Sequence, residues 1–229
     1  MDLVLATLQK RLLAYAMRRD ALAFGNFTTK AGRKSPYFFN SADMADGEGL
    51  DLIGHSYAAV ITLSGLQFDV LYGAAYKGIP LANVIAASLW QSCGTNVGVS
   101  YNRKESKSHG EGEDFVGADI KGKRVLIADD ALSAGTAVRE SFSIIRRHGD
   151  KKTIVTGIVV ILDRQERGTG ELSAKQEIEE TYEIPVLSIL TLDDVISFIE
   201  NGHGDSVFHE ARQHMSAVRE YRERYGPAA

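Results

Sequence analysis

Two adjacent carboxylates followed by a run of small residues make VLIADDALSAGTAVRE, from Val125 to Glu140, the segment best suited to chemistry. The apolar residues up to Ala128 predict a buried strand, with Asp129 and Asp130 just past its end. The small residues that follow predict a loop opening a helix, whose free backbone N–H groups would bind an anion. The carboxylates could accept hydrogen bonds from vicinal hydroxyls, and the nearby backbone amides could bind a phosphate. A phosphorylated ribose carries both kinds of group. The alternative, a strand, turn and helix with a capping acid, is less favoured because a cap needs only one acid.

Cations follow two other predicted strands. Lys77, in YKG, lies between glycines that would let the backbone approach a phosphate closely. Arg164, in LDRQERG, could bind a carboxylate through two parallel hydrogen bonds. Taken alone, the first signal is weak and the second is better explained by a surface salt bridge.

An aromatic and basic segment, FTTKAGRKSPYFFN, runs from Phe27 to Asn40 and predicts a binding loop or short hairpin. A planar anion could stack on an aromatic face there and accept hydrogen bonds from the cations. The alternative is that Phe38 and Phe39 fill the core and the cations are solvated. Periodicity leaves both open, since adjacent side chains of an extended segment point opposite ways.

The polar segment from Asn102 to Gly117, NRKESKSHGEGEDFVG, is too long to be a simple connection. Its cations on a glycine-containing loop could close over a pyrophosphate and exclude water. A solvated loop of mixed charge is the alternative, and the position after a predicted strand favours function. No zinc site is indicated, because the histidines and the one cysteine lack ligand spacing.

Composition predicts one globular domain: 229 residues, 44% hydrophobic and 24% charged. The formal net charge of −4 disfavours nucleic acid as a partner. No apolar run is long enough to span a bilayer and the first residues do not make a secretory signal, so no membrane association is expected. The single cysteine, Cys93, is interpreted as a buried thiol in a reducing, cytoplasmic compartment.

Helical and strand patterns alternate along the chain, which predicts an α/β fold with a mostly parallel central sheet flanked by helices. The predicted strands are Phe68 to Tyr72, Val97 to Tyr101, Val125 to Ala128, Thr153 to Leu162 and Val186 to Leu190. The predicted helices lie at residues 5–16, 50–63, 79–90, 137–148, 170–182 and 205–225. Ligands of such sheets bind beyond the carboxyl ends of the strands. One edge should therefore gather Lys77, Asn102 to Lys107, Asp129 to Thr136 and Asp163 to Arg167.

Together these segments resemble the orotate phosphoribosyltransferases of the type I phosphoribosyltransferase family. The match runs in order through FTTKAGRKSPYFFN, AYKGIP, NRKESKSHGEGE, IADDALSAGTAVRE and LDRQERGTGE. The resemblance implies the type I fold over residues 1–229, with a core at about 46–200 and a small N-terminal hood at about 1–45 plus part of the C-terminal region. It also implies Mg²⁺-dependent transfer of 5-phosphoribosyl from phosphoribosyl pyrophosphate (PRPP) to N1 of orotate. The products would be orotidine 5′-phosphate and pyrophosphate, in de novo pyrimidine (UMP) biosynthesis.

The resemblance assigns roles to individual residues. Orotate is expected to contact Phe38, Phe39, Ser133 and Arg164. PRPP is expected to contact Lys30, Tyr76, Lys77, Arg103, Lys104, Lys107, His109, Asp129, Asp130, Ala131, Leu132, Ser133, Ala134, Gly135, Thr136 and Ala137. The residues expected to act in catalysis are Arg103, Lys107, His109, Asp129 and Asp130. Lys107 is the candidate cation or acid at the leaving group. In the family, loop 102–117 reaches the neighbouring site of a homodimer, and Mg²⁺ is held mainly through PRPP oxygens, so no protein metal ligand is assigned.

Two positions depart from the family pattern. Ser133 replaces a threonine of many relatives and keeps the hydroxyl, whereas Ala74 replaces a proline and loosens the turn before Lys77. Two rival functions stay open: an enzyme for a different base, and a PRPP-sensing regulator. The regulator would not need the cationic loop at residues 102–117.

Overall fold

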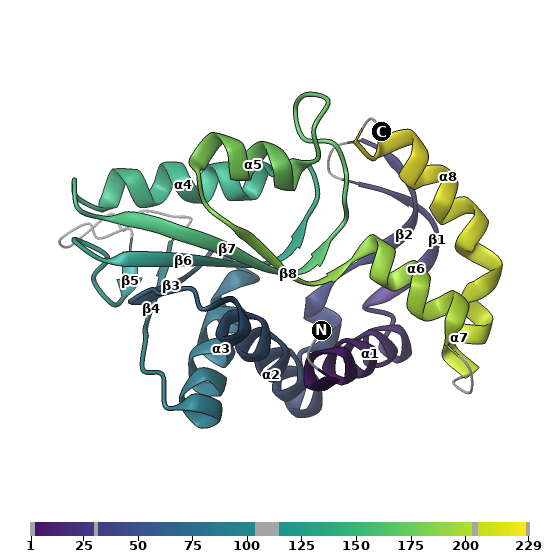
Figure 1. Ribbon diagram of the computed structural model, residues 1–229, viewed down its shortest axis with the longest axis horizontal. Coiled ribbons are helices and arrows are strands. Elements are labelled where there is room, and N and C mark those ends of the chain that lie inside the picture. Colours follow the sequence, from purple (N-terminus) through teal and green to yellow (C-terminus); the bar gives the residue numbers. More distant parts are fainter. Residues whose placement is uncertain (1–2, 30–31, 104–114, 203–205, 228–229) are drawn as a thin grey trace.

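The computed structural model describes residues 3–29, 32–103, 115–202 and 206–227. Its centre is a six-stranded sheet with the order β5-β4-β3-β6-β7-β8 (Figure 1). The strands are β3 (Val70–Gly73), β4 (Gly98–Asn102), β5 (Phe115–Gly117), β6 (Arg124–Leu132), β7 (Ile154–Asp163) and β8 (Val186–Thr191). Neighbouring strands are parallel except for β4 and β5, so the prediction of a mostly parallel sheet is confirmed.

Helices cover both faces of this sheet, one pair on each face (Figure 1). The pairs are α2 (Gly47–Ser64) with α3 (Gly78–Cys93), and α4 (Thr136–His148) with α5 (Ala174–Tyr182). Side chains of β6 alternate between the two cores: Leu126 and Ala128 join the one beneath α2 and α3, and Val125 and Ile127 join the one beneath α4 and α5. A strand buried on both faces needs an unbroken apolar run, which is what made β6 recognisable.

A second layer at one end of the sheet combines the two ends of the chain (Figure 1). Its elements are α1 (Leu3–Arg18), β1 (Leu22–Thr28), β2 (Lys34–Phe39), η1 (Ser41–Met44), α6 (Leu192–Asn201), α7 (Ser206–Ala211), η2 (Arg212–His214) and α8 (Met215–Tyr225). Strands β1 and β2 form an antiparallel hairpin. Tyr37 of β2 meets Tyr221 of α8 edge to face, with the ring centroids 5.8 Å apart. The hairpin and the last helix are thereby packed together.

Several predictions of detail are wrong. Strand β6 continues past Ala128 to Leu132, because β7 pairs with it as far as Asp163. The helix predicted for residues 205–225 is three consecutive helical pieces, α7, η2 and α8, within the described part of that range. Cys93 is exposed rather than buried, because α3 ends there and Gly94 reverses the chain with a φ of 67°.

Candidate active site

The acid pair lies at the carboxyl edge of the sheet, just beyond the end of β3. The last pairing of β3 joins Gly73 to Ala128, so at Asp129 and Asp130 the strand β6 has lost this neighbour. Asp130 is 8% exposed, and its Oδ2 accepts a hydrogen bond from Lys77 Nζ at 2.9 Å. The two acids therefore lie where β6 extends past β3, next to the cation of Lys77 in the turn after β3.

Asp129 is held by its surroundings at both backbone and side chain. Its carbonyl oxygen accepts a hydrogen bond from Tyr57 Oη at 2.7 Å, and its Oδ1 accepts one from the backbone N–H of Asp130 at 2.9 Å. Burial and the charge of Asp130 raise the pKa of Asp129 well above 3.8, against the opposing charge of Lys77. A ligand that brings hydrogen-bond donors would favour the ionised carboxylate.

The loop after β6 opens helix α4 without a side-chain cap. Gly135 occupies the N-cap position with a φ of 79° and has no side chain to cap the helix, and among the described residues no side-chain bond to the first backbone N–H groups of α4 is present. A Cβ on Gly135 would lie 2.9 Å from Arg139 Nη1 and 3.1 Å from Ile178 Cδ1. Glycine is thus required for both conformation and space, and the free donors and helix dipole suit an anion.

The turn between β3 and α3 presents Lys77 to the acid pair. The two elements approach so closely that a Cβ on Gly73 would lie 2.1 Å from the carbonyl oxygen of Gly78. Asn102, at the end of β4, holds the turn, since its Oδ1 accepts a hydrogen bond from the backbone N–H of Ala75 at 3.2 Å. Three strand ends therefore converge at Lys77.

Arg164 follows β7 on the same edge of the sheet. Its backbone N–H donates to the Leu132 carbonyl at 3.0 Å, and its side chain is 6% exposed with Cζ 4.2 Å from the centroid of the Tyr37 ring. Arg164 Nε and Ser133 Oγ both donate to Glu166, at 2.6 and 2.7 Å. The loop after β6 and the loop after β7 are thereby joined through one carboxylate.

Comparisons with known proteins agree with this geometry. The sequence matches the phosphoribosyl transferase domain family over residues 47–196. It is 44% identical over 218 residues to orotate phosphoribosyltransferase of Salmonella typhimurium, a match that covers 95% of this chain and 98% of that protein. This chain belongs to the orotate phosphoribosyltransferase family.

Solved structures of phosphoribosyltransferases share the fold. The orotate phosphoribosyltransferase of Francisella tularensis is similar with a TM-score of 0.75 and 32% identity, over 93% of this chain and 97% of that one. The Mycobacterium tuberculosis H37Rv orotate phosphoribosyltransferase in complex with PRPP has a TM-score of 0.59 and 20% identity, over 82% and 98%. At the lower identity the likeness concerns the fold alone. The type I phosphoribosyltransferase fold predicted for this chain is confirmed.

In this phosphoribosyltransferase the two predicted aromatic residues of the base pocket face opposite ways. Phe38 is 42% exposed and stacks on Phe27, with the ring centroids 5.5 Å apart. Phe39 is 8% exposed and belongs to the core. Filling of the core is thus confirmed for Phe39 and wrong for Phe38, and contact of orotate with either ring stays a prediction.

Of six further residues predicted to contact PRPP, the structure describes two. Tyr76 is exposed on the turn beside Lys77, and Arg103 is exposed just past β4. The predictions for four further residues lie outside the described part of the chain: Lys30, Lys104, Lys107 and His109.

Two residues of the site were missed by the sequence interpretation. Glu166 is 1% exposed and bonds Arg164 across Gln165, whose φ is 52°, so no strand periodicity in the sequence indicates the contact. Tyr221 of α8 donates to Glu166 at 2.8 Å. Nothing in the local sequence of the last helix indicates that contact, because it depends on tertiary packing.

The donors at this edge fit Mg²⁺ only in part. Among the described residues, no group of three or more His, Cys, Asp or Glu side chains is placed to hold a metal ion. Asp129 and Asp130 offer the oxygen ligands that Mg²⁺ prefers, but Asp130 is already paired with Lys77. These residues therefore fit an ion held mainly by oxygens of the substrate.

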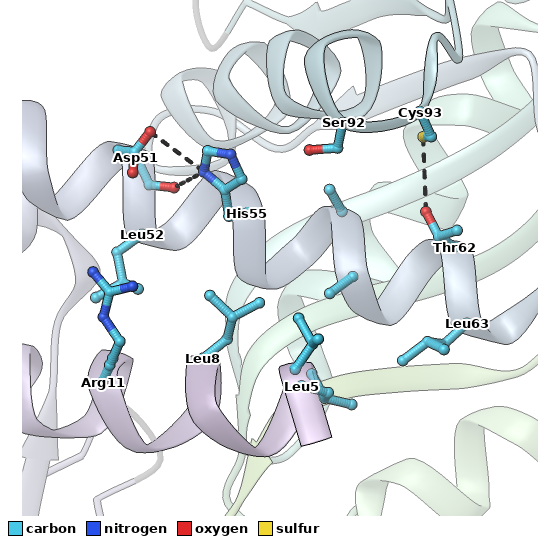
Figure 2. A pocket seen from close by; sticks show the side chains of 13 residues that line it. Leu5, Leu8, Arg11, Asp51, Leu52, His55, Thr62, Leu63, Ser92 and Cys93 are labelled. Carbon is cyan, nitrogen blue, oxygen red and sulfur yellow. Dashed lines mark hydrogen bonds and ion pairs between the residues drawn. The ribbon is translucent and has the colours of Figure 1, made fainter. Parts of the chain in front are cut away.

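A separate cavity of about 490 Å³ lies between α1, α2 and α3 (Figure 2). Leucines from α1 and α2 line it together with Arg11, His55 and Cys93. It contains none of the predicted site residues. Lys77, Asp129, Asp130 and Arg164 lie at the carboxyl edge of the sheet rather than at this cavity.

Proposed function

We propose that this chain transfers the 5-phosphoribosyl group from PRPP to N1 of orotate, forming orotidine 5′-phosphate and pyrophosphate in pyrimidine biosynthesis. One observation carries the proposal: the acid pair of β6, the uncapped start of α4 and the cation Lys77 meet at one edge, with Arg164 beyond β7. The 44% identity to the Salmonella typhimurium enzyme over 95% of the chain supports it.

The PRPP half of the site is built by β6 and α4. Asp129 and Asp130 accept hydrogen bonds from the ribose hydroxyls, while backbone N–H groups of the loop and of the first turn of α4 donate to the 5′-phosphate. Lys77, 2.9 Å from Asp130, offsets the charge of the acid pair and offers a cation to the diphosphate. Ribose and phosphate are thus bound by adjacent parts of one segment, Asp129 to Ala137.

The orotate half is assigned to β2 and the loop after β7. Arg164 offers a guanidinium for the carboxylate of orotate on the face of β2 that carries Ser35 and Tyr37. The exposed ring of Phe38 lies on the other face of β2, and its assignment to orotate comes from the family resemblance. Ser133 stands between the two halves, because it belongs to the PRPP loop and bonds the same Glu166 as Arg164. Base and sugar are therefore positioned on a shared support.

Catalysis depends on charge that develops as the bond from the anomeric carbon to diphosphate breaks. The ribosyl group gains oxocarbenium character and the leaving pyrophosphate gains negative charge before N1 bonds fully, so cations near the pyrophosphate lower the barrier. We assign this role to Lys107 with Arg103, Lys104 and His109, acting from the neighbouring subunit of a homodimer. Mg²⁺, when bound to PRPP oxygens, supplies further charge neutralisation.

The setting of the enzyme is also proposed. Residues 1–229 form one domain, with a core at about 46–200 and a hood made of about 1–45 and part of the C-terminal region. The enzyme acts in the cytoplasm, without nucleic acid or membrane as a partner. Among the residues that the structure describes, no helix is long and apolar enough to cross a membrane.

The test is pyrophosphate release on mixing the protein with PRPP, Mg²⁺ and one base at a time. Release with orotate and formation of orotidine 5′-phosphate are expected, with little release for uracil, adenine or hypoxanthine. Omission of Mg²⁺ should abolish release. Turnover of another base in place of orotate would contradict the assigned substrate, and PRPP binding without release for any base would favour a regulator.

A further inference from the structure

Glu166 is a buried carboxylate that accepts four hydrogen bonds, all from side chains. It is 1% exposed, and each of its oxygens accepts two hydrogen bonds. Oε1 accepts from Arg164 Nε at 2.6 Å and from Tyr221 Oη at 2.8 Å. Oε2 accepts from Arg33 Nη1 at 2.7 Å and from Ser133 Oγ at 2.7 Å. One side chain thus ties together the turn after β1, the loop after β6, the loop after β7 and helix α8.

The bonds to Glu166 decide which groups remain for a ligand. Arg164 uses Nε on Glu166 and Nη2 on Ser35 and Tyr221, which leaves Nη1 without a partner among the described residues. The hydroxyl proton of Ser133 is used on Glu166, so the oxygen of Ser133 faces a ligand only as an acceptor. A carboxylate fits the first group and a ring N–H fits the second.

The net charge of the cluster formed by Arg33, Arg164 and Glu166 suits a ligand with one negative charge. Two guanidiniums, Arg33 and Arg164, surround one carboxylate, which leaves one positive charge in excess. Burial raises the pKa of Glu166, but the charge of Arg164 and the hydrogen bonds from Ser133 and Tyr221 lower it by more than burial raises it. The net shift of the pKa is downward. Glu166 therefore stays ionised at neutral pH, and the cluster stays a monocation.

We propose that Glu166 is the positioning residue that sets base specificity: it fixes Arg164 as a donor to the carboxylate of the base and Ser133 as an acceptor for a ring N–H. This inference rests on the proposed transfer to orotate, whose carboxylate and ring N–H groups fit this pair. Glu166 does not touch the reacting atoms. It acts by holding the guanidinium of Arg164 and the hydroxyl of Ser133 in one orientation. Without the carboxylate, either group could change its conformation or its hydrogen-bond partner.

The test compares Glu166→Gln with the matched variant Glu200→Gln. Glu200 also forms an arginine pair that anchors α8, with Arg219, but on the exposed side away from the cluster. Loss of an ionised acceptor is expected to raise KM for orotate about 10- to 100-fold in Glu166→Gln. KM for PRPP should change far less than KM for orotate, because Glu166 contacts the PRPP loop through the side chain of Ser133 and not through its backbone donors. Glu200→Gln should leave both KM values unchanged, because Glu200 bonds Arg219 of α8 instead.

Coupling to Ser133 separates positioning from general loss of structure. Ser133→Ala should raise KM for orotate about five-fold or more in the wild-type background but by less than about two-fold in Glu166→Gln, because the acceptor orientation is already lost. If Glu166→Gln does not fold, Tyr221→Phe removes one donor and should raise KM for orotate alone. Unchanged KM for orotate, or equal rises for orotate and PRPP, would overturn the role of Glu166. Failure of the wild-type protein to turn over orotate would instead refute the proposed function.

Discussion

Replacing Gly135 by alanine tests the anion site at the start of α4. The residue has a φ of 79°, where an L side chain costs about 1–2 kcal/mol. The added Cβ would lie 2.9 Å from Arg139 Nη1 and 3.1 Å from Ile178 Cδ1, so these side-chain ends must shift, and Arg139 would give up its hydrogen bond to the Ala134 carbonyl at a cost of about 1 kcal/mol more. We expect Gly135→Ala to lower the free energy of unfolding by about 2–3 kcal/mol, or roughly 4–12 °C in Tm for a chain of this size.

Gly122 provides the matched control for this substitution. Its φ is 68° and no atom lies within 4 Å of its would-be Cβ, and it precedes β6 at the opposite edge of the sheet. Gly122→Ala should therefore cost only the conformational part, about 1 kcal/mol, with unchanged kinetics. The difference between the two variants isolates the effect of displacing the loop.

The assay is thermal unfolding together with steady-state kinetics. Gly135→Ala should raise KM for PRPP about ten-fold or more, since a displaced loop no longer aims its donors at the 5′-phosphate, while KM for orotate changes far less. A folded Gly135→Ala protein with wild-type KM for PRPP would refute the assignment of this loop to the phosphate. Equal stability losses in Gly122→Ala and Gly135→Ala would refute the steric argument.

Three other substitutions test the acid pair, the base pocket and the leaving group. Arg164→Lys keeps a charge but loses the planar fork whose Nε lies 2.6 Å from Glu166, so KM for orotate should rise about 100-fold with KM for PRPP unaffected; a wild-type KM for orotate in Arg164→Lys would contradict the assigned base pocket. Because burial and Asp130 raise the folded pKa of Asp129 above 3.8, the native state holds a proton there more tightly than the unfolded chain. Stability from this group should therefore fall as pH rises from about 4 toward neutrality, and urea unfolding of Asp129→Asn should show a flatter pH profile; an unchanged slope would contradict the shift. Lys107→Ala should lower kcat about 100-fold or more at saturating substrates, and mixing it with Asp129→Asn chains should restore activity if subunits share sites; full turnover of Lys107→Ala would remove Lys107 from the leaving group.

The sequence predicted well which residues gather at the carboxyl edge of β6, because most of them are local. Asp129, Asp130 and Gly135 lie within one strand, loop and helix, and the rule that ligands bind beyond parallel strand ends correctly placed Lys77 and Arg164 with them. Boundaries were less predictable. The length of β6 depends on how far β7 pairs with it, which no local pattern in β6 records.

The support of the base pocket was not predictable in the same way. Glu166 has an ordinary context in LDRQERG, and its partners come from separate stretches of the chain, including Arg33 and Tyr221. A surface salt bridge was the better local explanation of Arg164, whereas the structure buries that side chain to 6% exposure against Tyr37. Only packing of the hairpin against α8 removes the water that would otherwise make the pair weak.

This division between a local sugar-phosphate half and a dispersed base half has a physical basis. The match to the phosphoribosyl transferase domain spans residues 47–196, which includes the acid pair and the α4 loop but neither the hairpin with Phe38 nor α8 with Tyr221. The segment proposed to bind the ribose and 5′-phosphate of PRPP, Asp129 to Ala137, is contiguous and lies inside the matched range. A base is selected by its edge, so the groups that hold Arg164 and Ser133 in place are free to come from elsewhere. In this chain Arg33, between the strands of the hairpin, and Tyr221 of α8 donate two of the four hydrogen bonds to Glu166. Under the role proposed for Glu166, a change of base specificity would require changes in these two segments while β6 and α4 stay as they are.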